Sequence, residues 1–417
     1  PKMKKIGEYY YFLNAQGGTA GAPTSHMAVV ARSKSVDGPW ENSPCNPLIH
    51  TYSGEEQWWS KGHASLVDTP DGRWWAVYHA YEKDYLTLGR QTLLEPIEIT
   101  EDGWLKAPLE KKVEEEIPSP LSLNGAADRH ARLDEFRIGF DWKFYKRYQP
   151  RRVRVEGDTL VLQAQGGNPA ESSPMMFVTG AHKYEISARI ECDSAAVAGL
   201  ILYYNDRFYV GTGCDRHNRH KWRRGKYRGR SGQGDYTALW LKLRNEDHVV
   251  TGYYSYDGKK WMKETFGMEI SGYNHNTLDD FQSVLPGLFV YGKGKAQFTD
   301  FQYKELESGI GIIVNGDGLA LSTINQAQKM GMETACFLNL KGGVDRDKIA
   351  ASIKLIMTNP KVDGILINIL GGFLRCNLIA DGIITVANDL GLNIPLVVRF
   401  EGTNKNEATE ILQKSGL

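Results

Sequence analysis

The sequence lacks a long apolar run, an excess of either charge and any closely paired cysteines. Among its 417 residues, 50 Lys and Arg side chains balance 50 Asp and Glu side chains, so no global charge attracts nucleic acid or an anionic membrane. No apolar stretch approaches the roughly 18 residues that a membrane-spanning helix needs. The five cysteines are far apart, which predicts free thiols and argues against a disulfide scaffold or a cysteine zinc site. We therefore expect neither a membrane nor a nucleic-acid partner.

Tryptophan and tyrosine are missing from the last part of the chain. All ten tryptophans lie at or before Trp261, and all 21 tyrosines lie at or before Tyr303. Isoleucine, alanine and glycine follow in strand-then-helix order, which indicates a change of fold class. We expect three domains, at residues 1–125, 128–306 and 308–417.

The first two segments contain short aromatic strands separated by Gly, Asp and Asn. Such strands predict a sandwich, barrel or propeller, and the alternation in KYEISARIEC and LWLKLRN predicts a two-sheet antiparallel sandwich for the second segment. The candidate strands of the first segment span 8–14, 26–33, 63–69, 73–81 and 90–99. Those of the second span 159–165, 183–192, 198–205, 207–213, 239–245, 248–258, 287–294 and 295–306.

A basic loop interrupts the second segment at residues 215–230, DRHNRHKWRRGKYRGR. Trp222 and Tyr227 are interleaved with its Lys and Arg residues, a mixture that can bind nucleic acid or sugar phosphates. We favour the alternative of a long hairpin whose charges are solvated, because the chain carries no net charge.

The third segment alternates four strands with four helices, which predicts a flavodoxin-like, doubly wound parallel sheet. Its strands are expected at 310–314, 333–340, 363–370 and 395–400. Two strand-to-helix turns are glycine-rich, and such turns bring backbone N–H groups toward an anion, although tight packing also requires glycine. The candidate anion-binding residues are Asn315, Gly316 and Gly318 in the first turn and Gly371, Gly372 and Arg375 in the second.

The first segment resembles glycoside hydrolase family 43, the β-xylosidase and α-arabinofuranosidase group. The resemblance rests on YYYFLNAQGGTAG, HMAVVARSKSVDGPW, CNPLIH, KGHASLVDTPDGRWWAVYHA and LGRQTLLEPIEITEDGW, in this order. The second segment is similar to the accessory sandwich of these enzymes, with AGLILYYNDRFYV as its best match. The resemblance implies the end of a five-bladed propeller followed by a β-sandwich.

The same resemblance implies hydrolysis of O-glycosyl bonds with inversion, in xylan- or arabinan-type oligosaccharides. Inversion uses two carboxyl groups about 6.5–9.5 Å apart. In the family the general acid is a Glu before Gly-Pro, and the proline matches Pro1. We therefore expect no catalytic carboxylate within the chain and no activity of the chain by itself.

The resemblance also implies substrate-binding residues. His63, in GHAS, matches the histidine that holds water or a cation in the propeller channel, and Arg90, in LGRQT, matches the arginine that binds sugar hydroxyls; for both, a structural role is the alternative. Loop residues match more loosely, and adjacent tryptophans could stack on sugars, although alternation places one of each pair in the core. These further candidates are Thr19, His26, Trp58 and Trp59. The neighbouring acids Glu55 and Glu56 are expected to be solvated.

The third segment resembles the C-terminal domain of the succinyl-CoA synthetase β subunit. The matches are IVNGDGLALSTIN, NPKVDGILINILGGFLRCNLIADGII and NIPLVVRFEGTN. The resemblance implies an α-like partner subunit bound through 308–417 and a succinate or phosphate near Gly371 and Arg375. Phe373, Leu374 and Asn377 depart from the family pattern. Nucleotide and CoA are expected only if other chains supply the remaining ligase parts.

Three functions follow from these observations. The first is glycoside hydrolysis, with an oligosaccharide substrate and no certain cofactor. The second is a part in CoA-ligase chemistry, and the third is non-catalytic carbohydrate binding. Two unrelated partial enzymes in one chain predict a fused or fragmentary gene product. Free thiols and the lack of a visible signal peptide predict the cytoplasm, with a mitochondrial or secreted location left open by the truncated-looking start.

Overall fold

Most of the chain folds into two compact units, Pro1–Tyr303 and Lys304–Leu417. The computed structural model describes residues 1–70, 72–108, 133–145, 147–232, 234–306, 309–330, 332, 334–340, 346–357, 359, 361–371, 375–390 and 394–415. None of the helices in these ranges is long and apolar enough to cross a membrane. The three-domain division predicted from the sequence stays a prediction.

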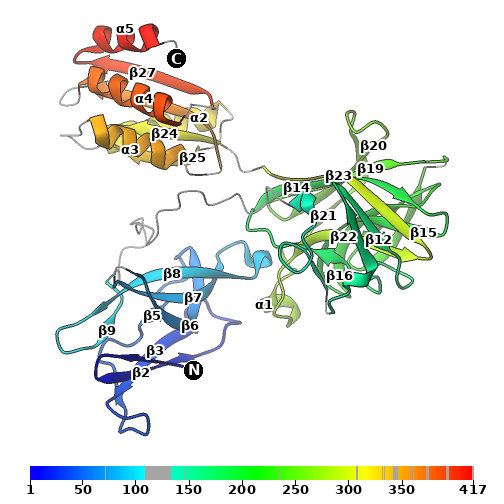
Figure 1. The fold of residues 1–417 in the computed structure, drawn as a ribbon, viewed down its shortest axis with the longest axis horizontal. Coiled ribbons are helices and arrows are strands. Elements are labelled where there is room, and N and C mark those ends of the chain that lie inside the picture. The colour runs from blue at the N-terminus through cyan, green and yellow to red at the C-terminus, as the bar shows by residue number, and fades with distance from the viewer. Residues whose placement is uncertain are drawn as a thin grey trace. The chain divides into compact units, whose positions relative to one another are not determined.

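Two antiparallel sheets make up the first part of the first unit (Figure 1). One contains β1 (Lys2–Ile6), β2 (Tyr9–Gln16), β3 (Met27–Ser33), β4 (Glu41–Asn42) and β5 (Ile49–His50). The other contains β6 (Trp58–Asp68), β7 (Trp74–Glu82), β8 (Arg90–Ile99) and β9 (Leu105–Lys106), and a 3₁₀ turn at Leu86–Leu88 joins β7 to β8. All five predicted strands are present in these sheets.

Alternating apolar residues hold these two sheets together. Tyr11 and Leu13 of β2 share a buried cluster with Ala64 and Leu66 of β6 and with Tyr78 of β7. Two neighbouring propeller blades pack in this manner, whereas the closed five-bladed ring stays a prediction. The polar strand β1 was not predicted, because KMKKI shows no apolar alternation.

Two seven-stranded antiparallel sheets form the rest of the first unit, in agreement with the predicted sandwich. The first sheet has the order β10-β13-β22-β15-β16-β17-β18. Its strands are β10 (Lys143–Phe144), β13 (Met175–Met176), β22 (Leu285–Gly292), β15 (Ala196–Asn205), β16 (Phe208–Cys214), β17 (Arg219–Arg223) and β18 (Lys226–Ser231). A main core lies between the two sheets and includes Leu200 of β15.

The second sheet has the order β11-β12-β23-β14-β19-β20-β21. Its strands are β11 (Val153–Glu156), β12 (Thr159–Gln163), β23 (Lys295–Glu305), β14 (Lys183–Cys192), β19 (Leu239–Glu246), β20 (Val249–Ser255) and β21 (Met262–Glu269). Short helical turns connect strands at Leu133–Glu135, Pro150–Arg152 and α1 (His275–Leu278).

The basic loop forms the β17–β18 hairpin, as expected, but its charges are not all solvated. Arg219 and Lys221 form ion pairs with Glu264 of β21 at 2.7 and 2.8 Å, and the Glu264 side chain is 3% exposed. The expectation of a solvated hairpin is therefore wrong for these two cations. It failed because the acidic partner lies some 40 residues away in the sequence, where the composition of the loop gives no sign of it.

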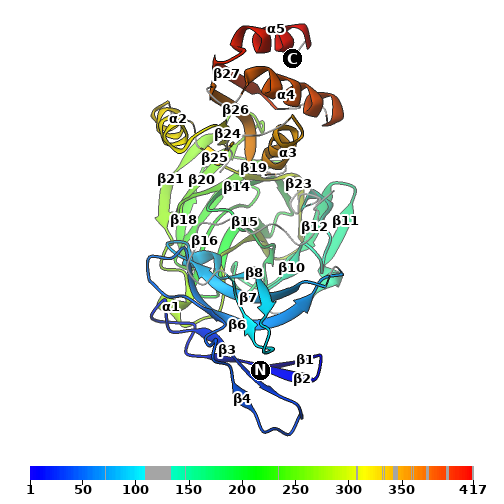
Figure 2. The same ribbon diagram turned by 90° about the vertical axis from the view of Figure 1, so that its left-hand side faces the viewer.

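The second unit is a parallel four-stranded sheet with the order β25-β24-β26-β27. Its elements are β24 (Gly309–Val314), α2 (Asp317–Lys329), β25 (Thr334–Asn339), α3 (Arg346–Met357), β26 (Val362–Gly371), α4 (Cys376–Leu390), β27 (Leu396–Gly402) and α5 (Lys405–Ser415). One buried cluster joins α2 to β24, and another joins α3, α4 and α5 to the opposite face. Figure 2 shows α2 on one side of β24 and α3 and α4 on the other. The predicted alternation of strands and helices is confirmed.

Candidate functional site

Three histidine rings meet on the two sheets of the propeller-like part. His26 precedes β3, His63 lies on β6 and His79 lies on β7. The His26 and His79 rings are stacked with centroids 5.2 Å apart, and the His63 ring is 6.0 Å from that of His79. Of the predicted site residues, the structure thus brings His26 and His63 together through a third histidine that the sequence analysis did not single out.

The backbone of β6 is shaped to admit these rings. Its pairing with β7 shifts register on both sides of Gly62, and His63 has a φ of +56°, a conformation uncommon for a residue with a side chain. A Cβ on Gly62 would lie 2.4 Å from Cδ2 of His26, so only glycine leaves room for that ring. Because of this irregular backbone, the His63 side chain is exposed, in contrast to a structural histidine inside a sheet.

Burial keeps two of the three histidines neutral. Desolvation, together with the positive charge of Arg90, lowers the pKa of His79 to about 4. Desolvation also lowers the pKa of His26, although the Gly17 carbonyl, 3.1 Å from Nδ1, opposes the shift. At neutral pH both rings are therefore hydrogen-bonding groups without charge.

These rings have unused hydrogen-bonding capacity. Nε2 of His26 and both ring nitrogens of His79 are buried without a hydrogen-bond partner among the described residues. Buried polar atoms in proteins almost always have a partner, which water or a ligand supplies when protein groups do not. A neutral imidazole offers one donor and one acceptor, so each of these nitrogens can pair with a water molecule or a hydroxyl group.

Arg90 stands at the edge of this histidine group, at the first position of β8. Its guanidinium lies 4.7 Å from the ring centroid of Phe281, in the loop after α1 of the sandwich. Both residues line a cavity of about 490 Å³ together with Tyr81 and Gln282. Arg90 is exposed, so its donors are accessible to a ligand. Phe281 could not be found from the sequence, because it comes from another part of the fold.

The other predicted residues of this site are less well placed. Thr19 is half-buried in the loop after β2, and neither it nor Trp58 makes a hydrogen bond or ring contact with the histidine group in the described parts of the chain. Trp59 donates from Nε1 to the Gly54 carbonyl at 3.1 Å. The expectation that alternation buries one tryptophan of the pair is wrong here, because both are half-buried beside the irregular stretch of β6.

The expectation that Glu55 and Glu56 are both solvated is half wrong. Glu55 is exposed, but the Glu56 side chain is 9% exposed and lies 2.8 Å from Nζ of Lys61. Glu56 also accepts hydrogen bonds from the backbone N–H groups of Tyr52 and Ser53. The carboxylate therefore caps a turn.

No group of three or more His, Cys, Asp or Glu side chains among the described residues has the geometry of a metal site. The cation that the resemblance places near His63 therefore stays a prediction.

The predicted anion site of the second unit lies where β24 and β26 end. The Asn315 side chain donates to the Leu370 carbonyl at 2.7 Å and accepts from the Leu370 N–H at 2.8 Å, which ties the two turns together. Gly316 has a φ of +117°, and its N–H donates to Oδ1 of Asn339 at 2.6 Å. Asn339 was not singled out from the sequence, although it ends the neighbouring strand.

The second glycine turn is described at its two ends. Gly371 is the last residue of β26, and Arg375 is exposed directly before α4, while Gly372 lies outside the described residues. In the first turn the space beside Gly318 is open, because a Cβ added to this glycine would meet no described atom within 4 Å. Arg375 is therefore accessible at the carboxyl edge of a parallel sheet, where such sheets bind ligands, whereas Cys376 at the start of α4 is buried and donates its N–H to the Thr403 carbonyl at 3.1 Å.

Three parts of the chain match known protein families. Residues 1–105 match glycosyl hydrolases family 43, residues 134–306 match the beta xylosidase C-terminal concanavalin A-like domain, and residues 313–417 match CoA-ligase. Both resemblances noted in the sequence are thereby confirmed.

Particular relatives agree with this division. The GH43 protein BlXynB from Bacillus licheniformis has a TM-score of 0.64 and 25% identity, with 73% of this chain and 64% of that chain covered. The xylan beta-1,4-xylosidase from Bacillus halodurans C-125 has a TM-score of 0.60 and 24% identity, with the same coverage of 73% and 64%. At this identity, the similarity to the xylosidase shows a shared fold and nothing more.

The second unit resembles ADP-forming succinate–CoA ligase subunit beta. The protein from Nitrobacter winogradskyi is 48% identical over 123 residues, which are 30% of this chain and 31% of that protein. The protein from Rhodospirillum rubrum is 46% identical, with the same coverage of 30% and 31%. This chain therefore spans about a third of the length of these curated relatives.

Proposed function

We propose that residues 1–306 are the substrate-binding part of a glycoside hydrolase of family 43, whose reaction is the inverting hydrolysis of O-glycosyl bonds in xylan- or arabinan-type oligosaccharides. The observation that carries this proposal is the pair of buried, neutral histidines with unpartnered ring nitrogens beside an exposed arginine. Hydroxyl groups of a sugar are suitable partners for such nitrogens and for a guanidinium. The two families that match this region support the same class of reaction.

In this proposal the described residues bind the substrate. They do not provide the two carboxyl groups that inversion requires. The family motifs assign neither the general acid nor the general base to a residue of 1–306. His26 would form one hydrogen bond with the substrate and His79 up to two, and Arg90 would hold a sugar hydroxyl beside the Phe281 ring. We therefore expect substrate binding without turnover.

Two assays on the purified chain test this proposal. Release of 4-nitrophenol from 4-nitrophenyl β-D-xylopyranoside is expected to stay at the background rate. Calorimetric titration with xylobiose is expected to show binding that Arg90→Ala weakens about tenfold, which corresponds to about 1.4 kcal/mol. Lys259→Ala, which removes an exposed cation elsewhere in the sandwich, serves as the control. Equal affinity in the two variants would exclude Arg90 from the binding site.

A second candidate function rests on the turns of the second unit. We propose that residues 308–417 bind a small carboxylate or phosphate at the ends of β24 and β26, where an α-like partner of a CoA ligase would dock. The Asn315 bridge and the exposed Arg375 support this site. Nucleotide and CoA would come with other chains.

Thermal unfolding in the presence of succinate or phosphate tests this second site. We expect either anion at 10 mM to raise the midpoint of the second unit by a few degrees, because a ligand that binds only the folded state stabilises it. Arg375→Ala should abolish the shift, while Lys414→Ala, at the far end of α5, should retain it. A shift that persists in Arg375→Ala would assign the effect to general salt stabilisation.

A further inference from the structure

One sheet of the sandwich carries aromatic residues on the face that points away from the main core. In β15, Leu200, Leu202 and Tyr204 belong to the main core, whereas Ile201 and Tyr203 belong to a separate buried cluster on the opposite face. The outer-face cluster consists of Met176, Ile201, Tyr203, Tyr209, Trp222, Leu285 and Phe289. The outer face of a sandwich sheet is ordinarily polar, so this aromatic surface needs an explanation.

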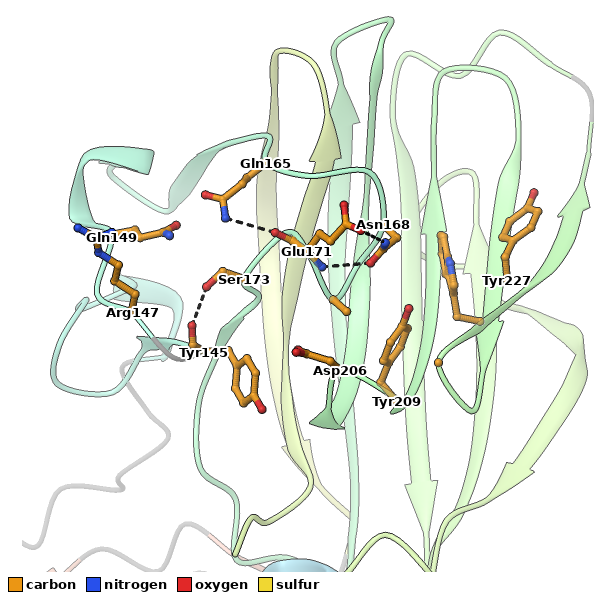
Figure 3. A pocket seen from close by; sticks show the side chains of 13 residues that line it. Tyr145, Arg147, Gln149, Gln165, Asn168, Glu171, Ser173, Asp206, Tyr209 and Tyr227 are labelled. Carbon is orange, nitrogen blue, oxygen red and sulfur yellow. Dashed lines mark hydrogen bonds between the residues drawn. The ribbon is translucent and has the colours of Figure 1, made fainter. Parts of the chain in front are cut away.

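A segment that precedes β14 packs against the outer-face cluster. Tyr145, Ala170 and Val178 pack against it, and beside them lies a cavity of about 610 Å³. Sites for small molecules have volumes of about 300–1,000 Å³. The aromatic part of the lining is formed by Tyr145, Tyr209, Trp222 and Tyr227, and Figure 3 shows Arg147 and Gln149 at one end of the cavity and Tyr227 at the other. We call this cavity the sandwich pocket.

The polar lining of the sandwich pocket is held in place by its own hydrogen bonds. Glu171 accepts from the Gly167 N–H and from Nδ2 of Asn168, both at 2.8 Å, and Gln165 donates to the Glu171 carbonyl at 3.2 Å (Figure 3). The side-chain oxygen of Gln149 accepts from Arg152 at 2.8 Å. The side-chain oxygen of Gln165 and the amino group of Gln149 have no hydrogen-bond partner among the described residues, so an acceptor and a donor remain available.

Tyr227 provides a flat surface at the edge of the pocket. It is 51% exposed, although its ring contacts Trp222 with centroids 5.7 Å apart. The Tyr227 hydroxyl is hydrogen-bonded to Nδ1 of buried His220 at 3.1 Å, and Nε2 of His220 lies 2.7 Å from Oδ2 of Asp215. An exposed ring that is fixed by two further side chains loses little conformational entropy when a ligand binds to it.

The charges of the pocket disfavour an anionic ligand. Glu171 and Asp206 line it together with one cation, Arg147. Both carboxylate oxygens of Glu171 already accept hydrogen bonds, so Glu171 does not need a cationic ligand as a partner. Aromatic rings combined with planar amide groups suit a molecule with apolar faces and many hydroxyl groups, namely a neutral sugar.

We propose that the sandwich pocket binds a neutral oligosaccharide, with one sugar ring stacked on Tyr227 and hydroxyl groups hydrogen-bonded to Gln149 and Gln165. The proposal deepens the proposed glycosidase function, because both concern the same class of ligand. It adds a second binding region, separate from the histidine group. A bound polysaccharide would then be retained near the propeller-like part independently of its binding there.

Calorimetric titration of the full chain with xylohexaose and with cellohexaose tests this proposal. We expect binding of at least one of them that Tyr227→Ala weakens about threefold to tenfold, the range for losing one aromatic contact. Tyr256→Ala is the matched control, because Tyr256 is also 51% exposed but does not line the pocket. Gln149→Ala is the second test variant, since it leaves the His220 contact of Tyr227 intact.

The outcomes separate this proposal from the proposed function. Loss of affinity in Tyr227→Ala and Gln149→Ala, but not in Arg90→Ala, assigns binding to the sandwich pocket. Loss in Arg90→Ala alone leaves the propeller-like site in place and overturns the sandwich-pocket proposal. Absence of binding by either hexasaccharide at 5 mM also overturns it. Circular dichroism of each variant shows whether the fold is retained.

Discussion

At the scale of single residues, the histidine group depends on one glycine and on burial. Gly62 leaves space for His26, and burial keeps His79 uncharged at neutral pH. The sequence predicted His26 and His63 through family motifs, but it did not predict His79. The signal was present, since His79 lies opposite Gly62 in the β6–β7 register, but its position in the apolar run RWWAVYHAY suggested a core strand.

The pKa of His79 predicts how stability responds to acid. It is about 4 in the folded protein and 6.5 ordinarily, so between these values the unfolded chain binds the proton more readily. The stability that neutral His79 contributes is present above pH 6.5 and is lost as the pH falls toward 4. We expect His79→Gln to reduce the acid-induced loss of unfolding free energy by about 1–2 kcal/mol, after allowance for solvent screening.

Urea unfolding followed by circular dichroism at pH 7 and pH 4.5 measures this effect. His217→Gln is the control, because that histidine is exposed on a hairpin and is not part of the histidine group. The same difference between the two pH values in wild type and His79→Gln would contradict a proton-linked role for His79.

At the scale of elements, strands with clear alternation were predicted nearly to the residue, and irregular ones were not. β14 begins and ends where KYEISARIEC does. β6 begins at Trp58, five residues before the predicted start, because Ser60 and His63 have positive φ values that interrupt its alternation. Such backbone conformations arise when the strand packs against another sheet. The local alternation of apolar and polar residues does not predict them.

The β17–β21 ion pairs lead to a prediction at this scale. Glu264 is buried between Arg219 and Lys221, so its neutralisation removes the carboxylate that these two partly desolvated cations share. We expect Glu264→Gln to lower the free energy of unfolding by about 3 kcal/mol. Glu98→Gln, at an exposed position of β8, should change it by less than about 0.5 kcal/mol. Denaturant midpoints with unchanged slopes measure both, and equal effects would show that Glu264 is not essential to the hairpin.

At the scale of the whole molecule, the chain combines an all-β unit with an α/β unit. Fold class and the strand–helix order of the second unit followed from periodicity, because regular secondary structure is a local property. The sandwich pocket and the contact of Arg90 with Phe281 could not be predicted from periodicity, because they bring together residues far apart in the sequence.

Two compact units predict two separate unfolding transitions. We expect Ile367→Ala, a fully buried position of β26, to shift one calorimetric transition by a destabilisation of about 2–5 kcal/mol and to leave the other unchanged. Leu288→Ala, equally buried in β22, should shift only the other transition. If either substitution moves both transitions together, the two units unfold as one.

The boundary between the units also divides the chromophores of the molecule. The first unit ends at Tyr303, which is the last tyrosine of the chain, and every tryptophan precedes it. Intrinsic fluorescence and near-ultraviolet absorbance from these rings therefore come from the all-β unit alone. The α/β unit has no tryptophan or tyrosine and does not contribute to these signals. A tryptophan introduced into it would add a new emission that responds to ligand binding and unfolding of this unit.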